Sequence, residues 1–328
     1  MKFPRRKFLH LAVGAAALPA VSHVARAQAY PSRPITLVVP FAAGGGADVV
    51  LRIIAERMRG FLGQTVMIEN VTGANGNIGT GRVFRVAPDG YTLGAGNWGS
   101  HVASGAIYTL PYDVVSDFQP VALHQIFYYV LAIKKSLPAN NLEELIAWLR
   151  ANPDRASFGS GGVGSQSHLA GIMFQKLTGT SFQHVPYRGA GPAIQDLVAG
   201  QIDLTFGDPS VVPYVRAGSV KAIAVAAKHR LPAVPDIPTA EESGLAGFAF
   251  ANWVGIFAPK RTPKDIIGKL SGAVMSTLAD PGIRQRLVDL GVEIPSPEQQ
   301  TPDGFASLQK ADIEQWWPII KAAGIKPE

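Results

Sequence analysis

Apolar residues follow two spacings along most of the chain. Runs of adjacent apolar residues, typical of buried strands, are followed by stretches with an apolar residue every three or four positions, typical of amphipathic helices. Between residues 30 and 93 this pattern predicts strands at 35–39, 65–68 and 91–93, and helices at 49–62 and 78–87. This β-α-β-α-β order predicts a parallel or mixed doubly wound sheet.

The same pattern restarts further along the chain. Strands are predicted at 128–133, 157–158, 182–185, 202–206 and 220–226, with helices at 142–150, 167–177 and 192–199. A strand at 254–258 and helices at 263–279, 281–290 and 301–323 follow. This tail is too short for a third domain, so we expect it to return to the first.

A chain that crosses twice between two α/β lobes has the layout of a hinge-closing binding protein. We therefore predict lobe 1 from residues 30–130 plus 252–328, and lobe 2 from residues 131–251. The alternative is one large α/β domain.

The first 29 residues are predicted to be an export signal. Four basic residues (Lys2, Arg5, Arg6 and Lys7) precede an apolar stretch, and two A-x-A sites place cleavage near Ala27 or Ala29. The segment is twin-arginine-like, but Pro4 stands where Ser or Thr is usual, so folded export and ordinary secretion both stay open. A buried amphipathic helix is the alternative. An export signal predicts an exported protein.

Charge looks different once this segment is removed. It carries five of the 30 Lys and Arg residues and no acid, which leaves 25 basic and 24 acidic residues in the mature chain. No basic run remains, so nucleic acid is not an expected partner. The chain has no Cys and hence no disulfides, and no later segment approaches the ~18 apolar residues of a membrane span.

Two glycine-rich turns are the strongest candidates for a binding site, because each follows a predicted strand and precedes a predicted helix. Glycine lets backbone N–H groups approach an anion at a helix N-terminus, and the second turn adds hydroxyl donors. Asp48 would repel a close anion, but Arg52 four residues on can pair with it. Each turn could alternatively be a strand–helix connection without a ligand. The candidate residues are Phe41, Ala42, Ala43, Gly44 and Gly45 in the first turn, and Ser160, Gly164 and Ser165 in the second.

Asn97 and Trp98 follow the predicted strand 91–93, at the carboxyl edge where open α/β sheets bind ligands. Trp98 could stack on an apolar ligand body or could pack under a loop.

Enzymatic chemistry finds little support. The sequence has no G-x-S-x-G, no H-E-x-x-H and no Cys. Two G-x-G-x-x-G matches, at 94–99 and 159–164, lack the remaining context of a dinucleotide site. We predict no catalytic residue, no metal and no cofactor; a hydrolase or dehydrogenase stays the alternative.

Several motifs in order resemble one family. They occupy residues 40–52, 69–79, 87–93, 110–113, 185–203, 235–239 and 253–255, across essentially the whole mature chain. Together they resemble the extracytoplasmic solute receptors of tripartite tricarboxylate transport, the Bug or TctC family.

The resemblance implies a two-lobed α/β periplasmic-binding-protein (Venus-flytrap) fold with two hinge crossovers. It implies that a small carboxylate lies between the two glycine turns, helped by bound water. A third loop would supply Tyr187, Arg188 and Gly189, and Asp208 would follow the strand 204–206. The implied partners are the carboxylate and membrane transporter subunits, and a monomer is expected. A sensor subunit that presents ligand to a receptor kinase is the alternative.

The chain departs from the family pattern at Ala43, where proline is common, and at residues 97–98, 128–129 and 207–209. The added aromatic residues make an aromatic carboxylate plausible beside a dicarboxylate.

Overall fold

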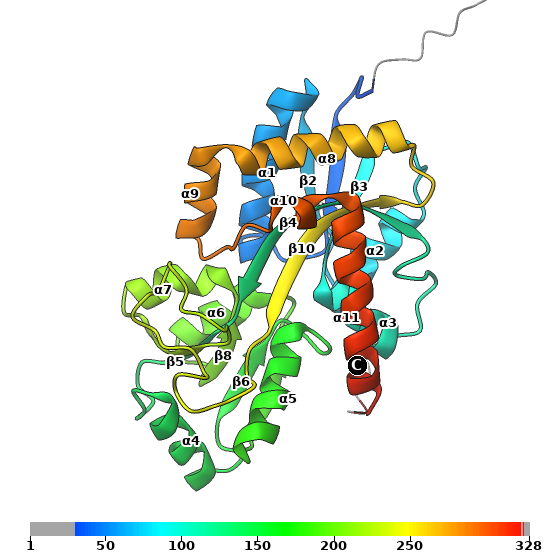
Figure 1. Ribbon diagram of the computed structural model, residues 1–328. Coiled ribbons are helices and arrows are strands. Elements are labelled where there is room, and N and C mark those ends of the chain that lie inside the picture. The colour runs from blue at the N-terminus through cyan, green and yellow to red at the C-terminus, as the bar shows by residue number, and fades with distance from the viewer. Residues whose placement is uncertain (1–29, 323, 325–328) are drawn as a thin grey trace, which may run out of the picture.

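Two five-stranded sheets form the framework of the computed structural model, which describes residues 30–322 and Gly324 (Figure 1). The predicted signal peptide lies outside these residues. The first sheet has the order β2-β1-β3-β10-β4 and the second β7-β6-β8-β5-β9. The first contains β1 (Ile35–Val39), β2 (Val66–Asn70), β3 (Thr92–Asn97), β4 (Phe118–Tyr128) and β10 (Ala251–Pro259). The second contains β5 (Val130–Lys134), β6 (Ser157–Ser160), β7 (Gln183–Pro186), β8 (Leu204–Gly207) and β9 (Val220–Val225).

The two sheets share one topology. In each sheet three neighbouring strands are parallel and the fourth is antiparallel to them: β10 in the first sheet and β5 in the second. This antiparallel strand is also the one on which the chain enters from the other sheet. The α/β class predicted from the sequence, with a mixed sheet, is therefore confirmed.

Helices cover both faces of each sheet, as in a doubly wound fold. Apolar residues of α1 and α8 form the core on one face of the first sheet, and those of α2, η3 and α11 the core on the other. In the second sheet the two cores involve α4 and α5, and α6 and α7. The helices are α1 (Gly46–Leu62), η2 (Ala74–Gly76), α2 (Asn77–Phe84), η3 (Gly99–Ala103), α3 (Ser104–Ile107), α4 (Leu142–Ala151), α5 (Gln166–Thr178), α6 (Ala190–Val198), η4 (Pro209–Val211), α7 (Val212–Arg216), α8 (Lys264–Ala279), α9 (Pro281–Asp289), α10 (Pro297–Gln300) and α11 (Pro302–Ala322).

The crossovers between the sheets lie side by side. Tyr129 alone separates β4 from β5, and Ala251 at the start of β10 pairs with Tyr128 at the end of β4. Figure 1 shows β4 and β10 as long neighbouring strands that run toward the second sheet. The connection is therefore two adjacent strands.

The predicted strand at 128–133 combined the end of β4 with β5, and the long strand β4 was not predicted. His124 and Gln125 in β4 are polar yet fully buried, and they interrupt the apolar pattern of this strand.

The C-terminal tail returns to the first half of the chain as expected, because α11 packs against β4, η3 and α3. Within the described residues, no helix combines the length and apolar character needed to cross a membrane.

Candidate functional site

A cavity of about 620 Å³ lies between the two sheets. The first half of the chain lines it through the first glycine turn, the segment 72–76, Ile78, Asn97 and Tyr108. The second sheet contributes the second glycine turn, residues 186–190 and Asp208, and the crossover strands contribute Phe127, Tyr129, Asn252 and Val254. The turns and the third loop predicted from the sequence are thus brought to one space.

Three helices begin at this cavity. Their N-cap residues are Gly45 for α1, Ser165 for α5 and Gly189 for α6, and all three line the cavity. The first N–H groups of a helix have no partner within the helix, and the helix dipole adds partial positive charge there. A space onto which three such ends open suits an anion.

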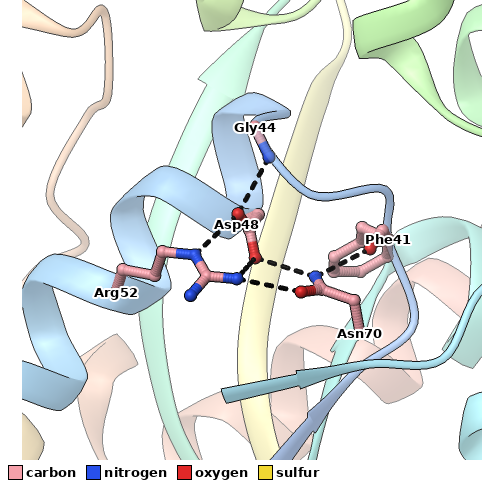
Figure 2. Close-up of polar contacts among 5 residues, drawn as sticks. All are labelled: Phe41, Gly44, Asp48, Arg52 and Asn70. Atoms are coloured by element: carbon pink, nitrogen blue, oxygen red, sulfur yellow. Dashed lines mark hydrogen bonds and ion pairs between the residues drawn. The ribbon is translucent and has the colours of Figure 1, made fainter.

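The first glycine turn is held by a network around Asp48 (Figure 2). The Asp48 carboxylate is only 1% exposed, and it accepts hydrogen bonds from Gly44 N–H (2.9 Å), Asn70 Nδ2 (2.8 Å) and Arg52 Nε (2.9 Å). Asn70 Nδ2 also donates to the Phe41 carbonyl at 3.0 Å. Burial acts to raise the pKa of Asp48, but the bonds from Arg52, Asn70 and Gly44 outweigh it and hold the pKa below its usual value.

The Asp48–Arg52 pair expected from the sequence is therefore formed. Arg52 and Asn70 both bind the Asp48 carboxylate, so the negative charge of Asp48 is compensated beside the anion site.

Internal bonds also hold the second glycine turn. The N–H groups of Gly161, Gly162 and Gly164 donate to Ser167 Oγ (3.0 Å), Ser160 Oγ (3.1 Å) and His168 Nδ1 (3.2 Å). These amides shape the turn and are engaged within it, whereas the first N–H groups of α5 have no partner within the helix and can serve a ligand.

Four predicted ligand contacts need a correction, because they do not line the cavity: Ala43, Gly44, Ser160 and Gly164. Ser160 is 1% exposed, and its hydroxyl hydrogen-bonds His184 Nε2 at 2.6 Å. The His184 ring stacks on that of His168, with centroids 4.0 Å apart. Burial, with a smaller contribution from His184, lowers the pKa of His168 to about 4, so the ring under the turn is neutral near pH 7.

The third loop lines the cavity as the resemblance implied. Arg188 is exposed, and among the described residues it forms no salt bridge. Tyr187 donates its hydroxyl proton to Asp196 at 2.6 Å. The third loop thus brings one cationic side chain to the cavity.

Asp208 connects the two halves across the cavity. Its carboxylate accepts from Ser210 N–H at 3.0 Å and from Gly46 N–H at the start of α1. Burial raises the pKa of Asp208, although the bonds from Ser210 and Gly46 act to lower it. A side chain that follows β8 of the second sheet thus binds the N-terminus of the first helix.

Asn97 and Trp98 have different surroundings in the structure. Asn97 lines the cavity and accepts a hydrogen bond from Ser100 N–H at 2.9 Å. Trp98 is 1% exposed and packs edge-on against Trp316, with ring centroids 5.4 Å apart. Its predicted role as a wall of the site is therefore corrected to packing in the core, because α11 of the tail covers it.

Sequence reasoning missed much of the cavity wall, including the segment 72–76 and the crossover residues Phe127 and Asn252. Asn252 Nδ2 donates to Tyr129 Oη at 2.7 Å, across 123 positions of sequence. Local sequence carries no signal of this pairing, which depends on the two crossovers being adjacent. Within residues 30–322, no group of three or more His, Cys, Asp or Glu side chains could hold a metal ion.

Comparisons with known proteins agree with this arrangement. The family described as "Tripartite tricarboxylate transporter family receptor" matches residues 50–325. The structure of the periplasmic binding protein BugD is 38% identical with a TM-score of 0.86, over 91% of this chain and all of that one. MatC of Rhodopseudomonas palustris with bound malate is 40% identical with a TM-score of 0.84, over 89% of this chain and all of MatC. The protein Rpa4515 of R. palustris with adipate is 34% identical with a TM-score of 0.87, over 91% of this chain and all of that protein.

Proposed function

This chain belongs to the tripartite tricarboxylate transporter receptor family, whose members are solute-binding receptors, and we propose that it binds a small carboxylate in the cavity between its two sheets. The convergence of the N-termini of α1, α5 and α6 on that cavity carries the proposal. Malate in MatC and adipate in Rpa4515 show that relatives with the same fold hold such ligands.

The ligand carboxylate is held by the first N–H groups of α5 and α6 and by Arg188 at the cavity. A charge-assisted hydrogen bond contributes roughly 1.5–3 kcal/mol, and micromolar binding corresponds to about 8 kcal/mol, so several such donors must act together. Phe41, Phe127 and Tyr129 supply apolar wall area for the body of a dicarboxylate or an aromatic carboxylate.

Binding couples to closure of the two lobes, which we take as residues 30–130 plus 252–328 and residues 131–251. The receptor is exported with its signal removed near Ala27 or Ala29, acts as a monomer, and delivers the ligand to membrane transporter subunits. No bond is made or broken.

Calorimetry on the mature chain, with malate, adipate and benzoate as probes, tests the function, together with mass spectrometry of ligand released from fresh protein. Binding of a carboxylate, or its release, is expected. No binding and no retained carboxylate would overturn the proposal.

Two glycine variants test the site itself. Gly189 has φ +117° and a Cβ there would lie 3.1 Å from Ala42 Cβ, whereas Gly244 has φ +88° and open space around it. Both Gly→Ala changes strain the backbone, but only Gly189→Ala opposes the approach of the two halves. We expect Gly189→Ala alone to weaken carboxylate binding; equal affinities in the two variants would refute this site.

A further inference from the structure

Two buried amide oxygens in the cavity wall have no hydrogen-bond partner among the residues that the structure describes. They are Asn252 Oδ1 and Gln166 Oε1, on residues that are 2% and 5% exposed. The nitrogen of each amide is engaged, because Gln166 Nε2 donates to the Ala251 carbonyl and Asn252 Nδ2 donates to Tyr129 Oη, both at 2.7 Å. A carbonyl only accepts, so Gln166 must direct Nε2 at Ala251, which leaves Oε1 as the free atom.

An unpartnered buried acceptor is costly, and most buried polar side chains have a partner. His124 and Gln125 also have unpartnered atoms, but neither residue lines the cavity. Asn252 and Gln166 differ because they border a space of about 620 Å³ that can hold a partner. A molecule in the cavity can therefore supply the missing donors.

Neighbouring groups add to the acceptor character of this wall. Asp208 lines the same cavity as Tyr129 and adds a buried carboxylate to this wall. Helix N-termini donate hydrogen bonds, whereas these side-chain oxygens accept them. One cavity thus offers two chemically distinct kinds of partner.

We propose that Asn252 and Gln166 form a subsite for an N–H or O–H group of the ligand, so that the receptor prefers carboxylates bearing a hydroxyl or amino substituent. The inference rests on the proposed function, since the carboxylate itself is held by the helix N-termini. Asn252 lies in β10, and Gln166 donates to the carbonyl of the neighbouring residue Ala251. The subsite therefore binds the ligand's N–H or O–H group at the crossover between the sheets.

Ligand pairs that differ only in the donor test the subsite by calorimetry. Suitable probes are succinate with malate and aspartate, adipate with 2-aminoadipate, and benzoate with 4-hydroxybenzoate. A site built around a donor rejects the analogue that lacks it, because the buried acceptors are then left unpaired. We expect the substituted member of at least one set to bind about tenfold tighter or more.

Gln166→Met and Asn252→Leu each remove one of the two oxygens. In each variant we expect the unsubstituted and the substituted ligand of a pair to bind with nearly equal dissociation constants, so that their ratio is near one. Gln125→Met is the matched control: it replaces another fully buried amide with unpartnered atoms, outside the cavity, and should keep the ratio. If Gln166→Met fails to fold, the Asn252→Leu variant and the affinities of the native protein for the ligand pairs still test the subsite.

The outcomes separate the two proposals. Equal affinities within every pair, or an unchanged ratio in both variants, would overturn the subsite and mean that water satisfies these oxygens. A lack of binding by every probe would instead overturn the proposed function, and the subsite with it.

Discussion

Replacement of Asp48 by Ala tests whether the first glycine turn depends on a buried carboxylate. The change removes the acceptor for Gly44 N–H and Asn70 Nδ2. Gly44 is exposed, so its N–H loses a net hydrogen bond of about 0.5–1.5 kcal/mol, whereas the part-buried Asn70 donor loses about 1–3 kcal/mol. Arg52 is about half exposed and can return to water, so its share is below about 1 kcal/mol. We therefore expect the free energy of unfolding to fall by about 2–5 kcal/mol near pH 7.

Urea unfolding followed by circular dichroism measures this loss. Asp48→Asn should lose less, because one side-chain oxygen remains as an acceptor. Asp236→Asn is the control, since Asp236 is exposed, and should change the unfolding free energy by no more than about 0.5 kcal/mol.

The pH dependence gives a second readout with a definite sign. The pKa of Asp48 is lowered in the folded state, where Arg52, Asn70 and Gly44 hold the charged form. Its contribution is therefore fully present above the unfolded pKa of about 3.9 and is lost as pH falls through the folded pKa. The stability gap between the native chain and Asp48→Ala should persist down to about pH 4 and shrink below it. A gap under about 1 kcal/mol at pH 7 would refute the reasoning.

Three further outcomes follow from burial and charge. Trp98→Ala should cost about 3–5 kcal/mol in calorimetric melting, because the ring is fully packed, whereas lost ligand affinity with unchanged melting would restore the cavity-wall role. Burial lowers the pKa of His124 to about 3, so the folded state binds fewer protons than the unfolded state and stability falls as pH drops below about 6.5. His124→Leu should reduce that loss by up to about 1.4 kcal/mol per pH unit in urea unfolding at pH 7 and pH 5, and an unchanged slope would contradict this. Arg188→Gln should weaken carboxylate binding and reduce its salt dependence in calorimetry, whereas equal affinity at all salt concentrations would place the ligand away from this loop.

Local sequence was sufficient to predict features that depend only on residues a few positions apart. The strand 35–39 and the break at Gly63 after the first helix follow from apolar spacing and from glycine in a left-handed conformation. The Asp48–Arg52 pair follows from the i,i+4 spacing of a helix. The two glycine turns were found for the same reason, because strand, glycines and helix start are contiguous in the sequence.

Burial by distant segments was not readable in this way. Trp98 follows a strand at the carboxyl edge of the sheet, and only the return of α11 shows that Trp316 covers it. Ser160 has the chemistry of a ligand donor, but the partner of its hydroxyl is His184 on the neighbouring strand. In both cases the sequence supplied a suitable side chain, and packing gave it a structural role.

The sequence by itself determined the class of this protein: two doubly wound α/β halves, with helix starts after glycine turns. Those features depend on contacts between residues a few positions apart, which periodicity and turn chemistry encode. Tertiary structure alone decided which atoms line the cavity. Tyr129 and Asn252 meet only because the chain crosses between the sheets twice at the same place, and that adjacency leaves two buried amide oxygens open to a ligand.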